Sequence, residues 1–97
     1  MTRALYAEFT ALPGAEARVA QLVAGLTALV RDEPGNLAFV PYTLESNPRR
    51  WFVYEVYADD EAFQRHIAAD YGADFNAELV TLIEEDASTL TWLLAAA

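Results

Sequence analysis

In the first third of the chain, the spacing of apolar residues changes from every second position to every third or fourth position. Apolar residues occupy alternate positions over Arg3–Leu12, which is the period of a strand, and Pro13-Gly14 then supplies turn chemistry. From Ala15 to Glu33-Pro34-Gly35, apolar residues recur at intervals of three and four, which predicts an amphipathic helix. Gly25, inside this helix, is predicted to permit close packing on a sheet. The apolar stripe comprises Val19, Leu22, Val23, Leu26, Leu29 and Val30.

Two further strands flank a turn in the middle of the chain. Leu37–Ser46 is rich in apolar and aromatic residues, but its Pro41 cannot donate to a ladder, which predicts an edge strand or a bulge. Glu45–Arg50 is rich in turn-forming residues, and Trp51–Ala58 returns as an aromatic-rich strand. We therefore expect these two strands to form a hairpin.

The last third predicts two more helices and a final strand. Asp59-Asp60 offers an N-cap to a helix, Gly72 interrupts the helical pattern, and Ser88–Leu94 reads as a strand. The inner face of the first of these helices comprises Ala62, Phe63, His66 and Ile67. The second is expected to turn Phe75, Leu79, Leu82 and Ile83 inward and Asp74, Glu78, Glu84 and Glu85 outward.

This order of elements is typical of an α+β, ferredoxin-like split-βαβ fold with a four-stranded antiparallel sheet. The length favours one domain over residues 1–97. Helices in this order cover one face of the sheet, yet Trp51–Ala58 is apolar on both faces. A second copy of the chain is the simplest cover for the open face, so we expect a homodimer that packs sheet against sheet.

The amino-acid composition excludes several classes of binding partner and of catalytic chemistry. A net charge of −9, with six arginines and no lysine, argues against nucleic acid and anionic membranes as partners. The chain has no cysteine and one histidine, so we expect no thiol chemistry and no metal site. No secretion signal or bilayer-spanning run is present, which makes a cytoplasmic location the expectation.

Glu55 and His66 are the two candidates for chemistry. Glu55 interrupts an apolar strand, where an unpaired buried charge is costly. It is either a carboxylate of raised pKa that acts as a base or orients one, or a structural acid satisfied by backbone amides or an arginine. His66 is either a general base towards a phenolic substrate, or a structural residue that holds Glu55 or a strand carbonyl in place.

Three motifs in order resemble the antibiotic biosynthesis monooxygenase family of dimeric α+β barrels. They are Glu33-Pro-Gly-Asn-Leu37, Phe52-Val-Tyr-Glu-Val-Tyr57 and Asp60-Glu-Ala-Phe-Gln-Arg-His-Ile67, and the resemblance spans essentially the whole chain. It implies a homodimer with one small pocket per subunit between sheet and helices. Some members of the family oxygenate polycyclic phenols or quinols with O2 and no flavin or metal, whereas others degrade haem or isomerise signalling molecules.

The chain departs from relatives of this family at several positions. The haem-degrading branch has an asparagine, a tryptophan and an iron-ligating histidine where this chain has Ala7, Tyr57 and a residue near Asn76. Many relatives carry a second histidine where this chain has Tyr71-Gly72. The resemblance therefore argues against haem degradation and against a mechanism with two histidine bases.

The leading hypothesis is a cofactor-independent monooxygenase acting on a phenol, anthrol or hydroquinone. His66, with Glu55, would remove a phenolic proton, and the resulting anion would itself reduce O2 in a dry site. The alternatives are a non-catalytic dimer that binds a small molecule and an isomerase of a small carbonyl metabolite. The aromatic residues expected to line the substrate pocket, or else to pack in the core, are Tyr57, Tyr54, Trp51, Phe63, Tyr71 and Phe75.

Charged residues outside this site are given structural roles. Glu8 is expected to be a hydrogen-bond partner at the dimer interface, and Arg49 and Arg50 are expected in a solvated turn. The acidic residues of the last helix are expected on a solvated face.

Overall fold

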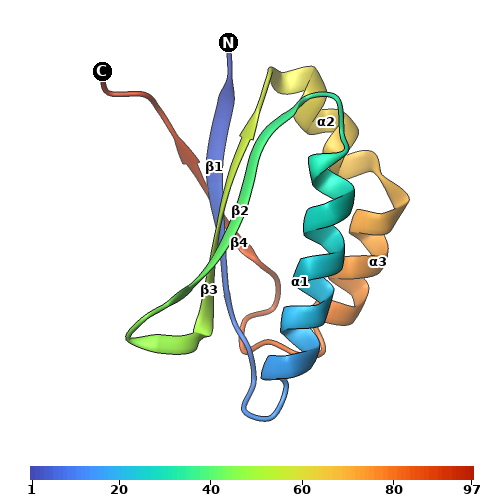
Figure 1. Cartoon of the computed structure of the whole chain (residues 1–97), viewed down its shortest axis with the longest axis vertical. Helices are drawn as coiled ribbons and strands as arrows, with labels where there is room; N and C mark the ends of the chain where they lie inside the picture. Colours follow the sequence, from blue (N-terminus) through green and yellow to red (C-terminus); the bar gives the residue numbers. More distant parts are fainter.

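The computed structural model describes residues 1–97 and confirms the ferredoxin-like plan, with three helices on one face of an antiparallel four-stranded sheet (Figure 1). The strands lie in the order β2-β3-β1-β4, so β2, which carries Pro41, is an edge strand as predicted. The elements are β1 (Arg3–Thr10), α1 (Glu16–Arg31), β2 (Asn36–Leu44), β3 (Asn47–Tyr57), α2 (Asp60–Ala68), α3 (Asp70–Leu79) and β4 (Thr89–Leu93).

The core lies between the sheet and the helices. Strand alternation turns Leu5, Ala7 and Phe9 of β1 towards the helices, where all three are buried. Arg31, at the end of α1, donates two hydrogen bonds of 2.8 and 3.1 Å to the carbonyl of Phe39, which fixes α1 over β2. Helix α1 contributes the buried residues Val19, Val23, Thr27 and Val30 to this layer.

Two expectations for α1 are wrong. Leu29 is 47% exposed, because the inner stripe passes through Thr27, whose hydroxyl is satisfied by the carbonyl of Val23 at 2.7 Å. Gly25 is exposed, and a Cβ placed there would meet no atom within 4 Å. The glycine therefore does not mediate close packing on the sheet.

The predicted turn between β2 and β3 is too long. The chain reverses at residues 45–46, and Asn47 already pairs with Leu44. Arg49 and Arg50 consequently lie in β3 rather than in a solvated turn. Arg49 bonds the carbonyl of Ala11 at 2.8 Å, and Arg50 bonds the hydroxyl of Thr10 at 2.9 Å.

The helical boundaries in the last third also differ from the prediction. The break between α2 and α3 falls at Ala69, which has an extended backbone, and Gly72 lies inside α3. Helix α3 ends at Leu79, and Ile83 is buried beyond it because it bridges to Ala11 at the end of β1. The sequence predicts the inward side chain correctly but assigns it to the wrong element.

The acids after α3 are not a solvated helical face. Glu85 accepts hydrogen bonds from the backbone and hydroxyl of Thr10 and pairs with Arg50 at 2.8 Å. Glu84 pairs with Arg49 at 2.9 Å. These contacts fasten the segment before β4 to the far end of the sheet.

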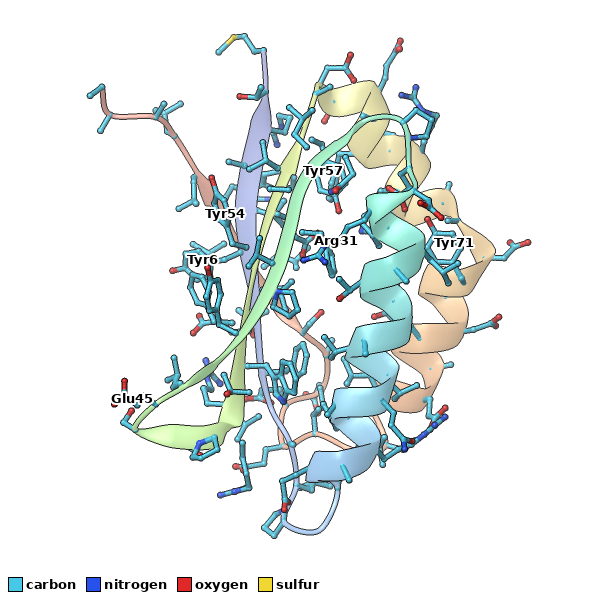
Figure 2. The ribbon with its side chains drawn as sticks, viewed as in Figure 1. Tyr6, Arg31, Glu45, Tyr54, Tyr57 and Tyr71 are labelled. Carbon is cyan, nitrogen blue, oxygen red and sulfur yellow. The ribbon has the colours of Figure 1, made fainter.

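The other face of the sheet carries no helix (Figure 1). Tyr6 and Phe52 stack on each other there with ring centroids 4.5 Å apart. Tyr54 lies beside them and points away from the helices, as does Tyr6 (Figure 2). None of the helices has the length and apolar character needed to cross a membrane.

Candidate functional site

A cavity of about 130 Å³ lies between the helix-facing side of the sheet and the helices. Strand residues such as Leu5, Phe9 and Phe39 form one wall, and Phe63 of α2 and Phe75 of α3 lie on the helical side. Most of its lining is apolar, and the polar side chains are those of Glu55, His66, Asn76 and Ser88. A concave, mostly apolar space with a few polar groups is the usual form of a small-molecule site.

Strand β3 places Glu55 in this cavity. Its register aligns Glu55 with Leu5 of β1 and Phe39 of β2, and both of those residues face the helices. Glu55 is therefore 5% exposed, flanked along the strand by the buried Val53 and Tyr57. Glu55 therefore lies on the helix-facing side of its strand.

Tyr57 is the hydrogen-bond partner of Glu55. Its hydroxyl donates to Glu55 Oε1 at 2.7 Å, so the expectation of backbone amides or an arginine as partners is wrong. Burial raises the pKa of the Glu55 carboxyl, while the Tyr57 hydrogen bond and the nearby His66 oppose this shift. Burial and the adjacent Glu55 also raise the pKa of the Tyr57 hydroxyl, which keeps it a donor.

His66 lies between two carboxylates. It stands one helical turn after the buried Phe63 on α2, which begins where Asp59 caps the backbone of Ala62 at 2.8 Å. Its Nε2 is 3.8 Å from Glu55 Oε1, and its side chain is 15% exposed. Its Nδ1 is 3.1 Å from Oε2 of the second carboxylate, Glu33.

Glu33 is a site residue whose role was not predicted from the sequence, where it appears only at the end of the first helix and in the first of the three motifs. Its side chain is 16% exposed, close to that of His66. The hydroxyl of Tyr71, on α3, donates to Glu33 Oε2. Burial, and to a smaller extent this hydrogen bond, raise the pKa of Tyr71 to about 12. An acid directly before the Pro-Gly pair, in a motif shared with the family resemblance, was the available signal.

The predicted aromatic lining divides into three groups. Phe63 and Phe75 line the cavity. Tyr57 and Tyr71 lie behind it as donors to the two carboxylates. Trp51 stacks on Phe9 at 6.1 Å and packs against the core, outside the cavity.

Tyr54 was predicted to share the pocket, and this is wrong. Successive residues of a strand face opposite sides of the sheet, so Tyr54 and Glu55 point in opposite directions. Tyr54 is 37% exposed on the open face (Figure 2). Phe39, Asn76 and Ser88, by contrast, were not predicted as lining and do line the cavity.

The arrangement is suited to moving a proton at the edge of an apolar space. Glu55 has a raised pKa, and the Nε2 of His66 has no hydrogen-bond partner within the chain. A hydroxyl group of a bound ring could meet both side chains in this corner. No group of three or more His, Asp or Glu side chains is arranged to hold a metal ion.

Comparison with known proteins gives a consistent result. Residues 2–78 match the family model described as antibiotic biosynthesis monooxygenase. A Mycobacterium tuberculosis protein superposes with a TM-score of 0.92 at 18% identity, covering 100% of this chain and 97% of that one. A Pseudomonas aeruginosa protein gives 0.90 at 23% identity, with coverages of 99% and 95%.

A third solved structure, described as a putative antibiotic biosynthesis monooxygenase from Caulobacter crescentus, has a TM-score of 0.90 at 23% identity. It covers 99% of this chain and 91% of that one. These identities are low, so the structural likeness establishes the fold alone. No curated protein matches the sequence.

Proposed function

The chain belongs to the antibiotic biosynthesis monooxygenase family, and from that premise we propose that it is a cofactor-independent monooxygenase of a phenol, anthrol or hydroquinone. The observation that carries the proposal is the pairing of His66 and Glu55 at 3.8 Å in the polar corner of an apolar cavity. Such a corner binds a ring and removes a proton from its hydroxyl group.

The reaction needs no electron source other than the substrate. His66 takes the phenolic proton, and the anion attacks O2 through a ring carbon that bears hydrogen, which is the para carbon of a simple phenol and a carbon ortho to a hydroxyl group in a hydroquinone. The peroxide anion that forms takes the proton back from His66. Loss of water from the peroxide gives a quinone. For a simple phenol, phenol plus O2 gives para-quinone plus water, and the four electrons that reduce O2 come from the ring. The mostly apolar walls offer few groups that hold water beside the anion and the peroxide.

Cavity size supports single-ring substrates. An apolar cavity of about 150 Å³ in another protein holds benzene. The space here, about 130 Å³, is close to that size. A polycyclic anthrol would have to displace the wall formed at the junction of α2 and α3, where Ile67 and Gly72 line the cavity.

Oxygen uptake with a substrate panel tests the proposal. We expect the purified protein to consume O2 with single-ring phenols and hydroquinones, and to do so more slowly with anthrones. An oxygen electrode records the rate, and identification of the quinone product checks the stoichiometry. Absence of substrate-dependent uptake across a broad panel would contradict the proposed reaction.

The same panel separates the two other hypotheses. A non-catalytic binding protein would gain thermal stability with a ligand and would consume no oxygen. An isomerase would form its product from a carbonyl substrate under anaerobic conditions.

We also propose that the protein is a homodimer through the open sheet face. Apolar side chains exposed on that face include Tyr42, Tyr54 and Leu93, with exposures of 56%, 37% and 42%. A monomer would leave this continuous aromatic surface in water, which favours association. Glu8 pairs with Arg50 on the same face at 3.2 Å, so both charges are already partnered within one subunit.

Disruption of this face is expected to give monomers. The wild-type protein should sediment at twice the mass of the chain, and Tyr54→Asp should sediment as one chain, because it places a charge in an apolar interface. Ala24→Asp, on the exposed side of α1, is the matched control and should remain dimeric. A wild-type monomer at micromolar concentration would contradict this arrangement.

A further inference from the structure

The carboxylate of Glu33 contacts His66 on the side of the ring that faces away from Glu55, and the proposed reaction assigns Glu33 no role. Both carboxylate oxygens of Glu33 lie near His66 Nδ1, at 3.2 and 3.1 Å. Both side chains are largely buried, at 16% and 15% exposure, so bulk water competes little for this contact. Tyr71 donates its hydroxyl proton to the same carboxylate and holds it from the α3 side.

The backbone around Glu33 fixes where its carboxylate points. The Glu33 amide donates to the carbonyl of Val30 at 2.9 Å, and the Glu33 carbonyl accepts from Asn36 at 3.1 Å. Gly35 packs directly on Ala62 of α2, the helix that carries His66. The end of α1 and the start of α2 are thus held together, and this brings Glu33 to His66.

The geometry decides which ring nitrogen carries the proton. An ionised carboxylate only accepts hydrogen bonds, so the Nδ1 that faces it must be the donor. A neutral imidazole has one N–H, and Nε2 is then left with a lone pair. The 3.8 Å between Nε2 and Glu55 is too long for a hydrogen bond, and Glu55 Oε1 is already bonded to Tyr57.

We propose that Glu33 is a positioning residue that holds His66 as the Nδ1–H tautomer, so that Nε2 is the basic atom that faces the cavity. The role of Nε2 as a base rests on the proposed function, whereas the tautomer itself does not. Besides Glu33, the groups around the ring are Phe39 from β2, Glu55 and Tyr57 from β3 and Phe63 from α2, with Tyr71 of α3 acting through Glu33.

The single histidine makes this proposal directly measurable. Protein labelled with ¹⁵N-histidine gives the two ring signals of His66 alone. At about pH 8, we expect a protonated Nδ1 and an unprotonated Nε2. A protonated Nε2, alone or together with a protonated Nδ1, would overturn the proposal without any mutant or substrate.

Two variants of Glu33 test whether its side-chain acceptor, rather than the rest of the site, sets the tautomer of His66. Glu33→Leu has a similar volume but no acceptor, and we expect the proton to redistribute towards Nε2. Glu33→Gln keeps an acceptor oxygen and should retain the Nδ1–H signal. Glu61→Gln, on the exposed side of α2 with 88% side-chain exposure, is the matched control and should leave both signals unchanged. An unchanged tautomer in folded Glu33→Leu would also overturn the proposal.

Kinetics provide the second readout. Glu33→Leu should lower kcat for oxygen uptake about 100-fold, the order of loss expected when a reacting group is misplaced, and should change KM little. Glu33→Gln should recover part of this rate. If the wild-type protein shows the Nδ1–H tautomer but no oxygen uptake, the proposed reaction fails and the tautomer assignment stands. Full kcat in folded Glu33→Leu would reject the positioning role.

Discussion

His66→Gln is expected to lower the rate of substrate-dependent oxygen uptake by roughly 10²–10⁴-fold, the usual contribution of a general base. The reason is geometric: His66 has the one ring nitrogen that lines the cavity without a partner in the chain. Glutamine retains a polar group of similar reach but is not a base at neutral pH. Steady-state oxygen-electrode kinetics, with unfolding recorded in parallel, measure the effect.

Two further variants make this result specific. Gln64→Ala lies on the exposed side of the same helix and should keep the wild-type rate. Glu55→Gln preserves an acceptor for the Tyr57 hydroxyl while removing the charge, and we expect a smaller loss than for His66→Gln. A folded His66→Gln protein with the wild-type rate would show that the histidine is structural.

Gly35→Ala is expected to destabilise the protein, because Gly35 is the one glycine at which an added methyl group overlaps a neighbouring atom. A Cβ at Gly35 would overlap the methyl carbon of Ala62 and lie 3.3 Å from its Cα. Overpacking of this kind costs about 1–3 kcal/mol of unfolding free energy. For a domain of this size, each 1 kcal/mol lowers Tm by roughly 4–8 °C. Thermal and urea unfolding measure the loss.

A second substitution, at Ala62, tests whether the overlap with its methyl group causes the loss of stability. Ala62→Gly in the Gly35→Ala background removes the overlapping methyl group and should restore part of the stability, less about 1 kcal/mol for a glycine in a helix. Gly25→Ala is the matched control, because its new methyl group meets no atom within 4 Å. It should raise the unfolding free energy by up to about 1 kcal/mol. Equal stability of Gly35→Ala and wild type would refute the packing argument.

For Glu55 and His66, the sequence predicts which neighbours share a face with each residue better than it predicts the hydrogen-bond partners. The alternation of β3 groups Glu55 with Val53 and Tyr57 on one face, and the helical spacing of α2 places His66 beside Phe63. Both faces of β3 carry apolar residues, so alternation alone does not decide which face meets the helices. The hydrogen bond from Tyr57 to Glu55 joins two residues of the same strand face, yet it depends on their rotamers. Strand periodicity also excluded Tyr54 from the pocket, and the pocket prediction erred by not applying it to every aromatic residue.

The amino-acid sequence by itself determined the order of strands and helices, restricted the proline-containing strand to an edge or a bulge, and grouped Glu55 with Val53 and His66 with Phe63, because these follow from local periodicity and turn chemistry. Tertiary structure alone decided that Tyr71, 38 positions after Glu33, donates to the carboxylate that contacts His66, and that Arg49 and Arg50 pair with Glu84 and Glu85. Such contacts depend on how whole elements pack, and local hydrophobic periodicity does not encode that packing.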